Sequence, residues 1–126
     1  MAHAKVSNVL VVEDEPRVRR LVSKALRRSG FVVLEAEDGE AALRLFGVHA
    51  PDIALLLTDV VMPGMNGPEL AASLSRSHPG LKVIFISGSG DAERSARRSA
   101  AAGAAHISKP FTPAALAGIV EGVLGT

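Results

Sequence analysis

Cysteine, tryptophan and tyrosine are all absent from this 126-residue sequence, and phenylalanine occurs only four times. Without cysteine there can be no disulfide, no thiolate metal ligand and no thiol chemistry, and this composition is typical of a reducing cytosol. The scarcity of aromatic rings leaves few surfaces on which a flavin or the bases of a single-stranded nucleic acid could stack. The composition therefore disfavours thiol chemistry, flavin binding and single-strand binding.

A long hydrophobic run and a strong net charge are also missing. No apolar stretch approaches the roughly 20 residues that a membrane-spanning helix needs, and residues 1–5 are too polar for a signal peptide. The formal charge is only +1, from 14 basic and 13 acidic side chains, so we expect no strong attraction to a polyanion. The sequence predicts a cytoplasmic protein that contacts neither membrane nor nucleic acid directly.

Five short runs rich in Val, Ile and Leu alternate with segments of helical periodicity. Each run is almost continuously apolar, which is typical of strands buried on both faces of a parallel sheet. Because crossovers between parallel strands are right-handed, this alternation predicts one doubly wound α/β domain with helices on both faces of the sheet. The expected strands are 8–12, 32–36, 53–58, 82–86 and 104–107, and the expected helices are 16–28, 39–48, 68–76, 91–102 and a last one capped by Thr112.

Charged residues follow three of these runs. Glu13 and Asp14 come directly after the first run, Asp59 follows the third, and Lys109 follows the fifth. Since the carboxyl ends of parallel strands share one edge of the sheet, where ligands bind, we expect these side chains to meet there. Carboxylates so close together need a cation to stay ionised, and oxygen ligands alone suit Mg²⁺. The sequence therefore predicts a Mg²⁺ site in which Asp14 and Asp59 bind directly and Glu13 holds a water.

Asp59 precedes a turn-rich loop, residues 62–67, which we expect to keep its carboxylate exposed. In isolation it would be read as a loop-capping acid. Within an acidic cluster, a carboxylate can attack a phosphoryl group and form an aspartyl phosphate, a reaction that needs charge neutralisation more than proton transfer. Lys109 would supply a compact positive charge, and Ser87 a hydroxyl donor to a phosphoryl oxygen. A solvated acidic loop, a surface lysine and a turn serine are the simpler interpretations of these neighbours.

Other phosphate and metal chemistries fit the sequence poorly. There is no G-x-x-x-x-G-K-[ST] loop, and residues 88–90 lack the third glycine and the first-strand position of a dinucleotide fingerprint. Phosphatases with an aspartyl nucleophile commonly carry a second Asp two residues later, where this chain has Val61. The histidines, which have no metal-binding spacing, are His3, His49, His78 and His106.

Four motifs in this order and at matching spacing resemble the receiver domain of two-component response regulators. Residues 9–16 read VLVVEDEP, 57–67 read LTDVVMPGMNG, 86–88 read ISG and 108–111 read SKPF. The resemblance covers essentially the whole chain. The chain is similar to the receivers of hybrid sensor kinases and to single-domain response regulators. It implies a flavodoxin-like, five-stranded parallel sheet of order 2-1-3-4-5 with five helices.

The resemblance also implies roles for individual residues. Asp59 would be the phospho-acceptor, Ser87 the switch hydroxyl and Lys109 the phosphate-binding lysine. The implied cofactor is Mg²⁺, and its ligands would be Glu13, Asp14, Asp59 and the backbone carbonyl of Val61.

Three positions, in two parts of the site, depart from the usual receiver pattern. His106 stands where receivers usually carry a Tyr or Phe whose ring moves inward when the hydroxyl engages the phosphoryl group. Either His106 simply faces solvent on an edge strand, or its protonation biases the switch, since an unperturbed His titrates near pH ~6.5. Val61 and Ser89 stand where many receivers carry polar side chains that position the hydrolytic water, so we expect slow self-dephosphorylation.

The resemblance implies a phosphorylation-switched module that accepts a phosphoryl group on Asp59 from a histidine kinase or a histidine phosphotransfer protein. Such a module would be no enzyme beyond its own phosphorylation and dephosphorylation. A phosphorylation-independent interaction domain is an alternative, as is a phosphate sink or relay receiver excised from a hybrid histidine kinase. The loss of one site residue would favour the phosphorylation-independent interaction domain. All five are present in this chain: Glu13, Asp14, Asp59, Ser87 and Lys109.

The sequence and the resemblance also predict the domain organisation and the partners. We expect a single receiver domain over residues 1–126, with a leader at 1–6 and no output domain. The first helix, residues 16–28, carries many basic side chains and no acid. By resemblance it would dock a helix of the kinase or phosphotransfer partner, and a homodimer through the last two β–α units is a further option.

Overall fold

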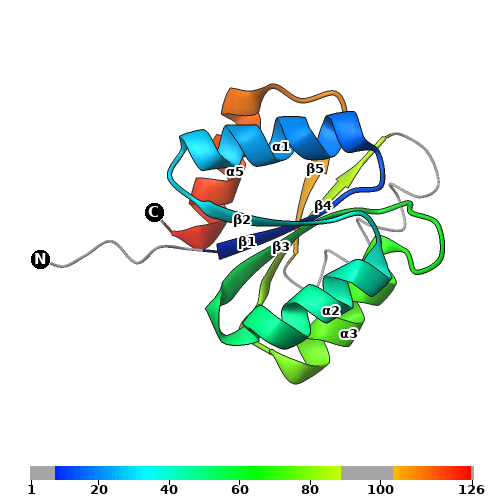
Figure 1. Ribbon diagram of the computed structural model, residues 1–126. Coiled ribbons are helices and arrows are strands. Elements are labelled where there is room, and N and C mark those ends of the chain that lie inside the picture. The colour runs from blue at the N-terminus through cyan, green and yellow to red at the C-terminus, as the bar shows by residue number, and fades with distance from the viewer. Residues whose placement is uncertain (1–7, 89–103, 126) are drawn as a thin grey trace, which may run out of the picture.

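The sheet has five parallel strands in the order β2-β1-β3-β4-β5, which confirms the predicted flavodoxin-like order (Figure 1). The computed structural model describes residues 8–88 and 104–125. The expected leader at 1–6, the expected helix at 91–102 and Ser89 lie outside the described residues. The strands are β1 (Asn8–Val12), β2 (Val32–Ala36), β3 (Ile53–Asp59), β4 (Lys82–Ser87) and β5 (Ala105–Ser108).

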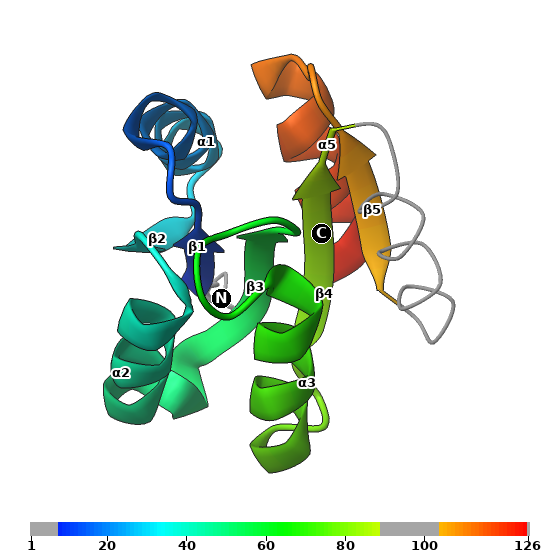
Figure 2. The ribbon, with the colours of Figure 1, turned by 90° about the vertical axis from the view of Figure 1, so that its right-hand side faces the viewer.

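The described helices lie on both faces of the sheet, as Figures 1 and 2 show. One face is covered by α1 (Pro16–Arg28) and α5 (Pro113–Leu124), and the other by α2 (Gly39–His49) and α3 (Gly67–Ser77). A short 3-10 turn, η1 (Ala50–Asp52), leads into β3. Among the described residues, no helix has both the length and the apolar character that crossing a membrane requires.

Burial on both faces of the sheet explains why residues 53–57 of the central strand β3 are apolar without interruption. Leu55 and Leu57 pack in the cluster beneath α1 and α5, whereas Leu56 packs in the cluster beneath α2 and α3. All three side chains are fully buried. Successive side chains of a strand point to opposite faces, so a strand covered on both sides must be apolar at every position.

Local capping fixes where each described helix begins. A polar side chain at every N-cap accepts a hydrogen bond from a backbone N–H of the first turn, which satisfies one of the donors that a helix start leaves unpaired. In α3 this is a complete capping box, because Glu69 also accepts from the backbone N–H of Asn66. The N-cap residues of α1, α2, α3 and α5 are Glu15, Asp38, Asn66 and Thr112.

Three strands end one residue later than the sequence pattern predicts, and one of them is β5, which ends at Ser108. Asp59 is the last residue of β3 because it pairs with Ile86, and Ser87 is the last residue of β4 because it pairs with Ser108. The apolar run stops at these positions although the hydrogen-bonded ladder continues. Both candidate functional side chains are therefore held by the sheet itself.

Candidate functional site

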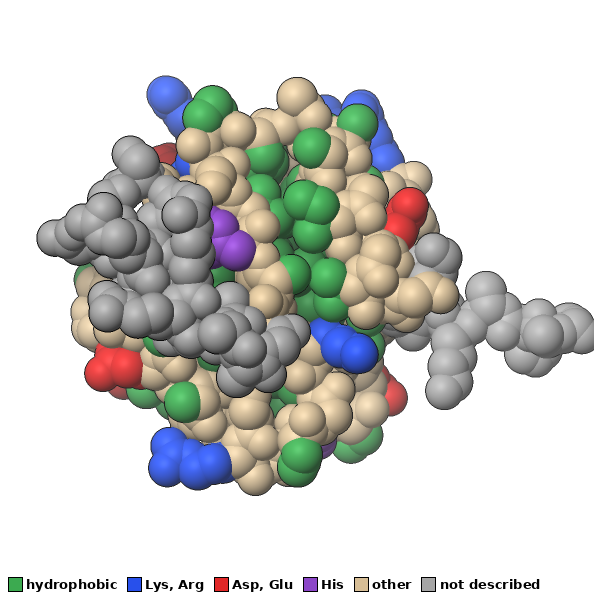
Figure 3. Space-filling model, turned by 180° about the vertical axis from the view of Figure 1, so that it is seen from behind, with side chains coloured by type: hydrophobic (Ala, Val, Ile, Leu, Met, Phe, Trp, Pro, Cys, Tyr) green, Lys and Arg blue, Asp and Glu red, His purple; other side chains and the backbone are tan. Residues whose placement is uncertain are grey.

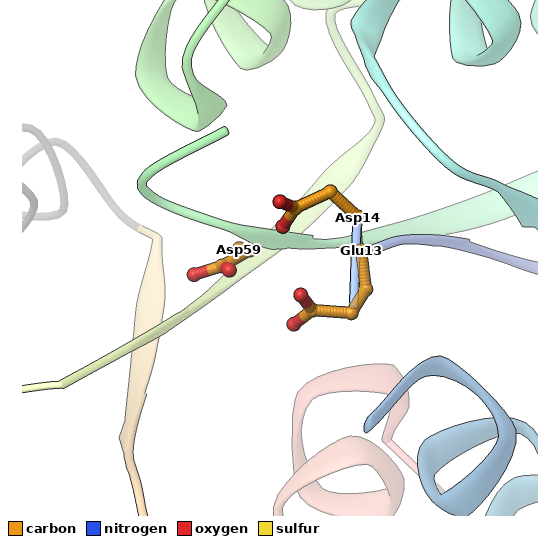
Figure 4. Close-up of side chains that lie close together, drawn as sticks. All are labelled: Glu13, Asp14 and Asp59. Carbon is orange, nitrogen blue, oxygen red and sulfur yellow. The ribbon is translucent and has the colours of Figure 1, made fainter. Parts of the chain in front are cut away.

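Three carboxylates meet at the carboxyl edge of the sheet. One ligand oxygen from each of Glu13, Asp14 and Asp59 can be chosen so that all lie within 4.8 Å of one another (Figure 4). The register produces this meeting, because Val12 of β1 lies opposite Thr58 of β3 and the next residue of each strand is acidic. Glu13 and Asp59 are buried and Asp14 is exposed, so the cluster opens to solvent on the Asp14 side.

The burial of Asp59 corrects the expectation that the following loop leaves its carboxylate exposed, since the residue is only 7% exposed. The loop folds back over the strand end: the backbone N–H of Val60 donates to Ile86, and that of Gly67 donates to Val60. A Cβ atom on residue 67 would collide with the backbone carbonyl of Asp59. Glycine at position 67 thus permits the close approach that buries the acid.

Lys109 is the basic member of the site. It follows β5, and its Nζ lies 3.4 Å from Oδ2 of Asp59 and 3.5 Å from Oε1 of Glu13. Its backbone N–H donates to the carbonyl of Ser87 at 2.8 Å, and its peptide bond to Pro110 is cis. The sequence-predicted meeting of acids from β1 and β3 with a lysine from β5 is thus present in the structure.

Glu13 carries the strongest electrostatic conflict of the site. Burial, assisted by the neighbouring charge of Asp59, raises the pKa of its carboxyl from 4.5 to about 7, although the backbone N–H of Glu15 and the charge of Lys109 act in the opposite direction. Oε1 is buried and has no hydrogen-bond partner among the described residues. A buried carboxylate oxygen that makes an ion pair with Lys109 at 3.5 Å but no hydrogen bond, beside two more carboxylates, fits a hard divalent cation such as Mg²⁺.

A residue that sequence reasoning did not single out holds the acidic loop. Arg19 of α1 donates from Nη1 to the backbone carbonyl of Glu13 at 2.8 Å, and its Nε lies 3.5 Å from a carboxylate oxygen of Glu35 on β2. Its side chain is 19% exposed, whereas the neighbouring Arg17 and Arg20 are exposed. The sequence contains no signal that separates Arg19 from the other basic residues of this helix.

Ser87 is buried at the end of β4, but no hydrogen bond joins its hydroxyl to Asp59. Its Oγ lies 2.7 Å from Nε2 of His106 on the neighbouring strand. His106 is half-buried on the edge strand, and its Nε2 faces the Ser87 hydroxyl rather than solvent. Its influence on the pH dependence of switching stays a prediction. The backbone carbonyl of Val61 likewise remains an expected Mg²⁺ ligand; the Val61 side chain is 61% exposed in the loop after β3.

The family model for the response regulator receiver domain matches residues 9–121. The chain belongs to this family. The match covers every described strand except the first residue of β1, so it includes all the residues of the candidate site.

Curated relatives include proteins of very different lengths. The receiver domain is 36% identical over 118 residues to the sensor kinase CckA of Brucella abortus, covering 94% of this chain but 12% of the kinase. It is 35% identical over 106 residues to the response regulator receiver protein CpdR of the same organism, covering 84% of this chain and 87% of CpdR. A receiver domain protein from Clostridium thermocellum has a solved structure that matches with a TM-score of 0.88 at 26% identity, covering 95% of each chain.

Proposed function

We propose that this receiver domain accepts a phosphoryl group on Asp59 in a Mg²⁺-dependent reaction. The observation that carries the proposal is the convergence on Asp59 of two further carboxylates and the Lys109 ammonium. In this proposal Asp59 is the nucleophile, Glu13 and Asp14 are cation ligands, and Lys109 is a fixed positive charge at the same sheet edge. Phosphoryl transfer needs chiefly positioning and charge stabilisation, which these groups are suited to supply.

In the proposed step, a carboxylate oxygen of Asp59 attacks the phosphorus of a phosphohistidine. The new O–P bond forms as the P–N bond breaks, and the departing imidazole keeps the electron pair and takes a proton from solvent. Glu13, Asp14, Asp59 and the carbonyl of Val61 would hold Mg²⁺, which when bound supplies positive charge to the phosphoryl oxygens. Lys109 adds a second positive charge, and the Ser87 hydroxyl would donate to a phosphoryl oxygen of the product.

The proposed donor is a histidine kinase or a histidine phosphotransfer protein. Support comes from membership of the receiver family and from the surface of α1, where the partly exposed Leu21 lies among basic side chains. A partner helix with apolar and acidic side chains would complement that surface. The exposed basic residues of α1 are Arg17, Arg20, Lys24, Arg27 and Arg28.

Self-association through the last two β–α units belongs to the same proposal. β5 and α5 lie on the side of the molecule seen in Figure 3, where hydrophobic side chains form a central strip and charged ones lie mostly toward the margins. Within α5 the one charged residue is Glu121. We propose a cytoplasmic domain that contacts proteins rather than nucleic acid or membrane, and that catalyses only its own phosphorylation and dephosphorylation.

The test is incubation with acetyl phosphate and Mg²⁺, followed by intact-mass measurement. We expect the mass of one phosphoryl group to be added to the wild type and to Asp52→Asn, a control at an exposed acid in η1. Asp59→Asn, or chelation of the metal, should abolish the adduct. If the folded wild type binds Mg²⁺ yet forms no adduct, the phosphorylation-independent interaction domain becomes the better account.

A further inference from the structure

The hydroxyl of Ser87 is held by a partner that lies on the next strand. β4 and β5 are side by side in the sheet (Figure 2), with Phe85 opposite His106 and Ser87 opposite Ser108. Ser87 and His106 are therefore diagonal neighbours on the same face, and the diagonal is bridged by the 2.7 Å contact between Oγ and Nε2. At this distance the contact is a strong, short hydrogen bond.

The direction of this hydrogen bond is set by the imidazole tautomer, and the hydroxyl that takes part in it is only 2% exposed. A buried hydroxyl can donate its single proton to a ring nitrogen or accept a proton from a ring N–H. Nε2 of His106 is the ring nitrogen that the described residues place within hydrogen-bond distance of Oγ. The imidazole tautomer with its proton on Nδ1 leaves Nε2 free to accept that proton.

We propose that His106 carries its proton on Nδ1 and is a positioning residue, whose Nε2 accepts from the Ser87 hydroxyl and holds it in the unphosphorylated domain. The proposal rests on the proposed function, in which the same hydroxyl donates to a phosphoryl oxygen on Asp59. One hydroxyl proton cannot serve both acceptors, so phosphorylation must break the hydrogen bond to Nε2. His106 thus opposes the hydrogen bond from Ser87 to the phosphoryl group. It thereby controls how readily the phosphorylated domain adopts the arrangement in which that hydrogen bond is made.

The hydrogen bond predicts a defined effect of replacing the imidazole. His106→Phe fills a similar space without an acceptor, so binding of beryllofluoride, a phosphoryl mimic, should tighten. A net contribution of ~0.5–1.5 kcal/mol for one hydrogen bond corresponds to about twofold to tenfold in the dissociation constant. His106→Gln retains a hydrogen-bonding side chain and should remain closer to the wild type.

A double-mutant cycle separates this role from general packing. In a Ser87→Ala background, His106→Phe should leave beryllofluoride affinity unchanged, because the hydroxyl that it releases is absent. Affinities are measured by titration in saturating Mg²⁺ and followed by fluorine NMR, with Mg²⁺ affinity and thermal unfolding recorded for each variant. If His106→Phe does not fold, His106→Leu replaces it in the same cycle.

The outcomes distinguish this inference from the proposed function. If wild type and Asp59→Asn both fail to bind beryllofluoride, the proposed phosphoryl site is wrong. If wild type binds in an Asp59-dependent manner but His106→Phe binds equally or more weakly, only the role of His106 is overturned. An equal tightening with and without the Ser87 hydroxyl would also overturn it.

Discussion

Val61 places an apolar side chain two residues after the proposed phospho-acceptor, at 61% exposure. Such a side chain cannot orient a water molecule for attack on an aspartyl phosphate, so the phosphorylated domain should be long-lived. Val61→Asn introduces an amide that can hold that water, and a hydrogen bond of ~1 kcal/mol would accelerate loss of the phosphoryl group about fivefold. The decay is followed by intact mass after acetyl phosphate has been removed. Val61→Leu is the matched control. If the phosphoryl group is lost from Val61→Asn no faster than from the wild type, this explanation is wrong.

At the scale of residues, the sequence predicted which side chains meet but not how they are held. The meeting of Glu13, Asp59 and Lys109 follows from strand ends that share one edge, which is a property of the chain's apolar pattern. The hydrogen bond between Ser87 and His106 depends on the rotamers of two side chains on different strands. No spacing in the sequence encodes that contact.

Among the elements, the loop between β3 and α3 depends on one glycine. In Gly67→Ala the new Cβ would press against the backbone carbonyl of Asp59, so the loop must move away from the strand end. We expect a loss of about 1–3 kcal/mol in the free energy of unfolding, together with slower phosphorylation of Asp59. Gly47→Ala in α2 is the matched control, because its Cβ would meet nothing within 4 Å and should be neutral or stabilising. Urea unfolding of the two variants checks this, and equal stabilities would contradict it.

The ends of the strands were predicted less accurately than their positions in the chain. Side-chain periodicity placed β1, α1 and β2 at the residues where they are observed. It stopped one residue early at Asp59 and Ser87, because polar side chains end the apolar run before the backbone ladder ends. Asp59 was expected to be exposed because a turn-rich loop follows it, but that loop folds back over the strand end and the residue is buried.

For the whole molecule, the alternation of strands and helices was enough to predict a doubly wound domain. The specific order 2-1-3-4-5 came from the family resemblance, because right-handed crossovers alone allow several orders. The ion pairs of Glu35 with Arg19 and Arg27 link α1 to β2 and were not predictable. Long-range pairs of this kind depend on the packed arrangement, which becomes known only once the sheet order is fixed.

The stability of the whole domain should depend on pH and Mg²⁺ together, through Glu13. Its folded pKa of about 7 lies above the ordinary 4.5, so the folded state binds this proton more tightly than the unfolded chain does. The resulting stabilisation is complete below pH 4.5 and is lost as the pH rises through 7. Without Mg²⁺, the melting temperature should therefore fall between about pH 5 and about pH 8, by about 4 °C for each kcal/mol lost.

Mg²⁺ should reverse this loss, because the cation and the proton compete for the same carboxylate. At a concentration of ~100 times its dissociation constant, a bound ligand adds about 2.7 kcal/mol to the free energy of unfolding. The gain in melting temperature at a fixed Mg²⁺ concentration should thus be larger at about pH 8 than at about pH 5. Glu13→Gln, which cannot ionise, should flatten the metal-free pH dependence and weaken the response to Mg²⁺, whereas Glu40→Gln at an exposed position of α2 should preserve both. Scanning calorimetry at the two pH values checks this, and equal gains at both would show that Glu13 does not control the coupling.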